Sequence, residues 1–158
     1  MASRGVTRRP RVNARMANVA TRTWDRVHGG SPLSPQPCVL IVDALEESQE
    51  VFRAALEARG VRVLTADEAE TGLTLAQRHQ PDVIVLDVDG ANAGRRACDD
   101  LLAHSRRDDR QLVVLGKTCR SRDQDRGLFV SKPYHYAPLI RKIEALLDQV
   151  RLRVLASG

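Results

Sequence analysis

The sequence of 158 residues has few aromatic side chains and no long apolar run. Aromatic residues make up 3% of the chain, and the single tryptophan, Trp24, lies outside its apolar part. Proteins that bind single-stranded nucleic acid stack bases on aromatic rings, so this composition argues against that class. No apolar stretch approaches the length of a membrane-spanning helix, and we therefore expect no membrane insertion.

Cysteine is also scarce, and its three positions, Cys38, Cys98 and Cys119, lie far apart. An odd number at these spacings fits neither a disulfide framework nor a zinc motif. Free cysteines suit a reducing compartment, so we expect a cytoplasmic protein.

Positive charge is concentrated at one end of the chain. The formal net charge is +5, but residues 1–37 alone hold seven arginines and one acid, Asp25, which leaves the rest close to neutral. Residues 29–37 consist largely of glycine, serine and proline, which block regular helices and sheet ladders. We therefore predict a disordered basic arm and linker over 1–37, followed by a domain over 38–152.

The basic arm allows several interpretations. The favoured one is a solvated tail with weak, non-specific contact to nucleic-acid phosphates. An arginine-rich, acid-poor stretch is also typical of an organellar transit peptide. Translation from Met16 would leave residues 1–15 out of the protein altogether.

From Cys38 onward, apolar runs of two kinds alternate with amphipathic stretches. Residues 39–42, 83–86 and 112–115 are continuously apolar, which is typical of strands buried on both faces. Residues 61–64 and 128–130 are mixed or short, as edge strands would be. Helical spacing of apolar residues predicts helices over 46–60, 67–79, 93–104 and 136–152. Such alternation predicts an α/β fold with a five-stranded parallel sheet, strand order 2-1-3-4-5 and helices on both faces.

The crossover between the fourth and fifth strands is an exception. Residues 117–127 are rich in arginine and aspartate and almost devoid of apolar side chains. A full crossover needs at least about 10–12 residues including its helix. We therefore predict that the fourth helix of the fold is shortened or absent.

Three charged residues follow the carboxyl ends of the expected strands. Asp43 follows 39–42, Asp87 follows 83–86, and Lys132 follows 128–130. Ligands and reactive groups of open parallel sheets collect at these ends, so we expect the three side chains to converge. Two close carboxylates need a counter-charge, which the lysine and a Mg²⁺ ion can supply. A carboxylate in that setting is a plausible nucleophile toward a phosphoryl group. Taken singly, each aspartate could equally be a helix cap.

Three motifs in register carry a resemblance to a known family. Residues 39–43, 81–87 and 129–133, read as VLIVD, PDVIVLD and FVSKP, resemble the receiver domain of bacterial two-component response regulators over about 38–150. The resemblance implies a flavodoxin-like fold. It also implies a phospho-accepting aspartate at Asp87, the first of an acidic pair at Asp43, an essential lysine at Lys132 and a switch aromatic at Phe129.

The sequence also departs from the family pattern at three positions. Ala44 stands where the family has its second acid, so we expect Mg²⁺ to bind weakly, through Asp43, Asp87 and the backbone carbonyl of Asp89. Gly116 stands where the family has a threonine or serine, so the switch hydroxyl is missing. Asp89-Gly90 replaces the usual Met-Pro after the phospho-acceptor, and the Asp89 side chain could partly replace the lost acid.

The resemblance implies a stand-alone module of a two-component phosphorelay. It would accept a phosphoryl group on Asp87 from a histidine kinase or phosphotransfer protein and act through contacts with an unidentified downstream protein. Such a module is not an enzyme beyond the transfer to its own aspartate. The alternative is a pseudo-receiver, a protein-interaction module with no phosphate switch. A third hypothesis is an adaptor tethered to an anionic partner through residues 1–37.

Overall fold

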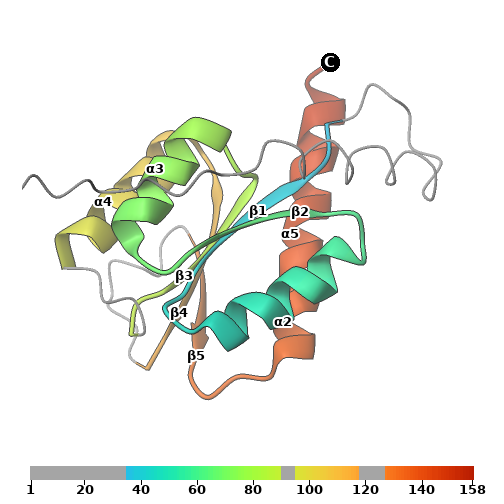
Figure 1. The fold of residues 1–158 in the computed structure, drawn as a ribbon. Coiled ribbons are helices and arrows are strands. Elements are labelled where there is room, and N and C mark those ends of the chain that lie inside the picture. Colours follow the sequence, from blue (N-terminus) through green and yellow to red (C-terminus); the bar gives the residue numbers. More distant parts are fainter. Residues whose placement is uncertain (1–34, 90–94, 118–126) are drawn as a thin grey trace, which may run out of the picture. The chain divides into compact units, whose positions relative to one another are not determined.

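Strand and helix alternate along the chain, as the apolar pattern predicts (Figure 1). The computed structural model describes residues 35–89, 95–117 and 127–158, and Gln36–Gly158 forms one unit. The elements in chain order are β1 Cys38–Val42, α2 Glu46–Glu57, β2 Arg62–Ala66, α3 Ala69–His79, β3 Val83–Asp87, α4 Arg95–Arg107, β4 Gln111–Gly116, β5 Leu128–Ser131 and α5 Tyr136–Ala156.

The strands form one sheet in the order β2-β1-β3-β4-β5, and all four pairs are parallel. The predicted α/β class and the predicted strand order 2-1-3-4-5 are therefore confirmed. β1, β3 and β4 are buried almost throughout, whereas the edge strands β2 and β5 are half-exposed. Burial follows the division between continuous and mixed apolar runs, because only a central strand is covered on both faces.

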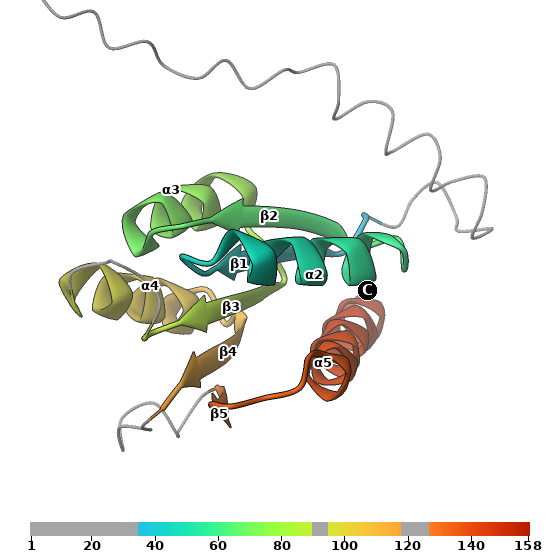
Figure 2. The same ribbon diagram turned by 60° about the horizontal axis from the view of Figure 1, so that its bottom comes forward.

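Each central strand divides its side chains between two apolar cores. In β1, Val39 and Ile41 pack on one face with α2 and α5, while Leu40 and Val42 pack on the other with α3 and α4. This alternation follows from the two-residue period of a strand. Figure 2 shows the two helix pairs on opposite sides of the sheet. The sandwich holds the sheet rigid and leaves its carboxyl rim free to carry a site.

Several element ends differ from the sequence-based expectation. α2 ends at Glu57 rather than at 60, and Gly60 follows with a φ of 76°, a left-handed conformation that suits glycine. α4 continues to Arg107, three residues past the predicted end. α5 extends to Ala156, past the expected end at 152, and leaves Leu152, Val154 and Leu155 exposed.

Some expectations fall outside the described residues. These are the basic arm, apart from 35–37, the expected free cysteine Cys119, and the shortened or absent helix, which concerns 118–126. Over the part of the chain that is described, no helix has both the length and the apolar character needed to cross a membrane.

Candidate functional site at the carboxyl rim

Backbone register brings the charged residues to one place on the rim. Val42 pairs with Leu86 in the parallel strands β1 and β3. The next residues along the two strands are Asp43 and Asp87, so the two acids lie beside one another at the carboxyl rim. On the other side, Gly116 pairs with Ser131, and the amide of Lys132 donates to the carbonyl of Gly116 at 3.0 Å. Lys132 therefore leaves β5 beside the end of β4, and its long side chain reaches across β4 to β3.

Asp87 and Lys132 are in direct contact. The Lys132 Nζ lies 2.5 Å from the Asp87 Oδ2, and the Asp89 amide donates to the other Asp87 oxygen at 2.9 Å. The Asp87 side chain is 1% exposed and that of Lys132 is 22% exposed. A carboxylate this deeply buried needs such partners to offset the loss of hydration. Asp87 and Lys132 therefore lie together, as the strand order predicts.

Asp43 lies in the same acidic cluster but is less well compensated. Its Oδ1 accepts a hydrogen bond from the Leu45 amide at 2.9 Å. Its Oδ2 is buried and has no hydrogen-bond partner among the described residues. Burial raises the pKa of Asp43 and repulsion by Asp87 adds to the rise, while the Leu45 amide, Lys132 and Ser48 partly offset it. An unsatisfied buried oxygen beside a second carboxylate is a position that a cation would stabilise.

The residues at this rim are suited to bind a divalent cation weakly. Within 35–89, 95–117 and 127–158 there is no group of three or more acidic, histidine or cysteine side chains suited to a metal. Ala44 offers no ligand, and one oxygen of the Asp89 carboxylate already accepts the Lys117 amide at 2.7 Å. Asp43 and Asp87 would therefore hold Mg²⁺ together with backbone and water oxygens, which Mg²⁺ commonly retains. When bound, the ion would neutralise charge on phosphoryl oxygens.

The position of the missing hydroxyl is filled by Val88, which lies in the turn after β3. A Cβ added to Gly116 would lie 2.7 Å from a methyl of Val88 and 3.7 Å from the Phe129 ring. Val88 and Phe129 both pack against the α3/α4 core. The space beside Gly116 is thus occupied, mainly by apolar side chains, and Phe129 is half-buried rather than exposed.

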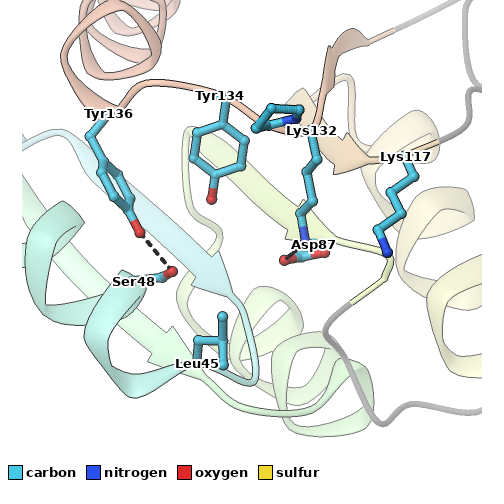
Figure 3. Close-up of a pocket in the computed structure, with 8 residues that line it drawn as sticks. Leu45, Ser48, Asp87, Lys117, Lys132, Tyr134 and Tyr136 are labelled. Carbon is cyan, nitrogen blue, oxygen red and sulfur yellow. Dashed lines mark hydrogen bonds and ion pairs between the residues drawn. The ribbon is translucent and has the colours of Figure 1, made fainter.

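A pocket of about 500 Å³ opens over Asp87 and Lys132 (Figure 3). Its other lining residues come from the start of α2, the residue after β4, and the segment from the end of β5 to the first residue of α5: Leu45, Ser48, Lys117, Pro133, Tyr134 and Tyr136. The Ser48 hydroxyl bonds the Tyr136 hydroxyl at 2.9 Å, and the rings of Tyr134 and Tyr136 meet edge to face at 5.6 Å. Burial, with the nearby Tyr136, Asp43 and Asp87, raises the pKa of Tyr134 to about 12. Tyr134 therefore stays a neutral hydroxyl beside the acidic cluster.

Sequence reasoning missed Lys117, Ser48, Tyr134, Tyr136 and Val88. Tyr134 follows directly after Lys132-Pro133, and Lys117 follows directly after Gly116, so the neighbouring motifs could have drawn attention to both. Nothing in the sequence marks Ser48 or Val88, because their importance arises from packing between elements that are distant along the chain.

The fold is that of a known class. A five-stranded parallel sheet in this order, covered by helices on both faces, is the fold of the receiver domains that the sequence resembles. Among solved structures, the signal receiver domain of a putative LuxO repressor protein from Vibrio parahaemolyticus matches with a TM-score of 0.66 and 15% identity, over 78% of this chain and 99% of that one. The receiver-domain resemblance is therefore confirmed at the level of fold.

Curated proteins point the same way. The chain is 30% identical over 128 residues to the probable transcriptional regulatory protein TcrX of Mycobacterium tuberculosis, covering 76% of this chain and 53% of that protein. It is 28% identical over 121 residues to the protein PilH of Pseudomonas aeruginosa, covering 69% of this chain and 96% of PilH. The chain thus spans about half the length of TcrX. No protein-family model matches it.

Proposed function

We propose that the chain is a receiver-type signalling module that accepts a phosphoryl group on Asp87 from a histidine kinase or phosphotransfer protein. It then acts through contacts with a downstream protein. The observation that carries the proposal is the pairing of a carboxylate 1% exposed with the Lys132 ammonium, 2.5 Å away at the floor of an open pocket. Catalysis is limited to transfer onto its own aspartate.

The proposed step uses few groups. An Asp87 oxygen attacks the phosphorus, the bond from phosphorus to the donor imidazole nitrogen breaks, and the imidazole leaves with the bonding electron pair. The carboxylate becomes an acyl phosphate, and the phosphoryl group carries roughly two negative charges near neutral pH. Lys132 moves from pairing the carboxylate to pairing the phosphoryl oxygens.

Intact-mass spectrometry after incubation with acetyl phosphate and Mg²⁺ tests the proposal. We expect a gain of one phosphoryl group that disappears in Asp87→Asn and is sharply reduced in Lys132→Gln. Asp148→Asn, an exposed carboxylate on α5, is the matched control and should gain the same mass as the wild type. No gain at saturating Mg²⁺ and donor would exclude the phosphorelay role.

A pseudo-receiver is the second candidate, and one observation favours it. Val88 occupies the space beside Gly116, so a larger side chain at position 116 would require Val88 to move. A domain of this kind would bind its partner with the same affinity before and after treatment with acetyl phosphate. The mass measurement above distinguishes the two candidates.

A further inference from the structure

Lys117 lies at the same pocket as Lys132, although no motif of the sequence points to it. Both lysines line the pocket that contains Asp87. They come from the ends of adjacent strands, and Figure 3 shows both side chains extending into the region of Asp87. A second cation at this place needs a physical account, because Lys132 already pairs with the carboxylate.

The backbone of Lys117 is tied to the phospho-acceptor turn. Its amide donates to the Asp89 Oδ2 at 2.7 Å, and the Asp89 amide donates to the Asp87 Oδ1 at 2.9 Å. Two consecutive hydrogen bonds thus connect Asp87 to Lys117. This linkage holds the Lys117 backbone at the pocket edge, while the residue is exposed and carries a long, flexible side chain.

Charge balance indicates what that ammonium does. Asp43, Asp87 and the neighbouring Asp89 are three acids, so Lys132 alone leaves two excess negative charges at this rim, and Lys117 offsets one of them. Phosphorylation of Asp87 would replace one negative charge by roughly two. The site has lost a hydroxyl donor at Gly116 and a metal-binding acid at Ala44, so its need for another cationic donor is greatest in that state.

We propose that Lys117 is a second oxyanion-binding residue of this pocket, contacting the phosphoryl group on Asp87 and supplying a donor in place of the missing hydroxyl. Its ammonium donates up to three hydrogen bonds and carries charge that would otherwise come from the metal ion. The inference rests on the proposed function for the identity of the anion, but oxyanion binding itself can be measured without phosphoryl transfer.

The test uses inorganic phosphate and the variant Asp87→Asn, in which a neutral amide replaces the carboxylate and no longer repels the anion. Phosphate is titrated without Mg²⁺, and binding is followed by NMR shifts of the backbone amides at 117 and 132. Adding Lys117→Gln should weaken binding roughly fivefold, the effect of one partly exposed charge. Lys142→Gln, an exposed lysine on α5, is the matched control and should leave the affinity unchanged.

An equal phosphate affinity with and without the Lys117→Gln change would overturn the inference, and so would an absence of phosphate binding in Asp87→Asn. If only the proposed function is wrong, the result differs: phosphate still binds more weakly after Lys117→Gln, but acetyl phosphate adds no mass to the protein. In the chain with Asp87 intact, Lys117→Gln should also raise the Mg²⁺ concentration needed for half-maximal phosphorylation.

Discussion

The packing of Val88 against Gly116 makes a quantitative prediction about stability. Replacing Gly116 by alanine adds a single Cβ, which would lie 2.7 Å from the Val88 Cγ2. The next contacts, with the Phe129 ring at 3.7 Å and an Asp89 oxygen at 3.8 Å, are ordinary van der Waals distances. Any loss of stability in Gly116→Ala therefore comes from the overlap with Val88.

The size of the effect follows from two opposing contributions. Overpacking of this kind costs about 1–3 kcal/mol. Among the described residues, the glycine with a left-handed φ is Gly60, so the backbone at Gly116 accepts alanine without strain. Alanine also restricts the unfolded chain more than glycine does, which stabilises the folded state by about 0.4–1 kcal/mol. We expect Gly116→Ala to lower the free energy of unfolding by about 1–2 kcal/mol. Val88→Ala should lower it by about 1 kcal/mol, because Val88 is only half-buried.

The double variant Gly116→Ala with Val88→Ala tests whether the overlap with Val88 causes the loss, or whether β4 is destabilised by any larger side chain at position 116. Without the valine methyls there is no overlap, so Gly116→Ala in the Val88→Ala background should be neutral or slightly stabilising. Urea denaturation followed by circular dichroism gives the coupling, expected at about 1–3 kcal/mol. Val150→Ala on α5 is the control partner and should combine additively with Gly116→Ala. Additive losses for the Val88 pair as well would refute the packing argument.

Three further predictions concern the acidic cluster and the tyrosines. Because burial raises the folded pKa of Asp43, ionisation of this carboxyl destabilises the fold. Its contribution to stability should fall as pH rises from the ordinary aspartate range through the raised pKa, so Asp43→Asn should be more stable than the wild type at neutral pH without Mg²⁺. Urea titrations across pH measure this, and a flat difference between the two proteins would contradict it. In Tyr136→Phe, which leaves Tyr134 as the only tyrosine of the sequence, burial still raises the pKa of Tyr134, although the contribution of Tyr136 is lost. Ultraviolet absorbance at about pH 11 should therefore show clearly less ionised phenol than the roughly nine tenths of an ordinary tyrosine, and nine tenths would contradict the effect of burial. Ala44→Asp should tighten Mg²⁺ binding roughly tenfold by calorimetry, and an unchanged affinity would refute the ligand assignment.

The sheet was predictable from the sequence because burial of a central strand leaves a continuous apolar run. Residues 39–42, 83–86 and 112–115 follow that rule and become β1, β3 and β4. Helix ends were less predictable, since α5 continues past 152 through residues that contact no core. Its final turns are held by local backbone bonding, for which the apolar spacing gives no signal.

The site was predictable only in the part that the backbone places directly. Asp43, Asp87 and Lys132 follow strand ends, so the strand order alone brings them together. The unsatisfied Asp43 oxygen and the Val88 methyl beside Gly116 depend on side-chain packing across strands, which one sequence does not encode in any local pattern. The roles assigned to these residues in phosphoryl transfer stay predictions until they are measured.

The most direct measurement maps the phosphoryl group itself. Trypsin should release residues 79–95, a peptide that contains Asp82, Asp87 and Asp89. After treatment with acetyl phosphate and Mg²⁺, fragmentation of this peptide should place a single phosphoryl group on Asp87. A phosphoryl group on Asp82 or Asp89, or an unmodified peptide under conditions that saturate donor and metal, would contradict the account.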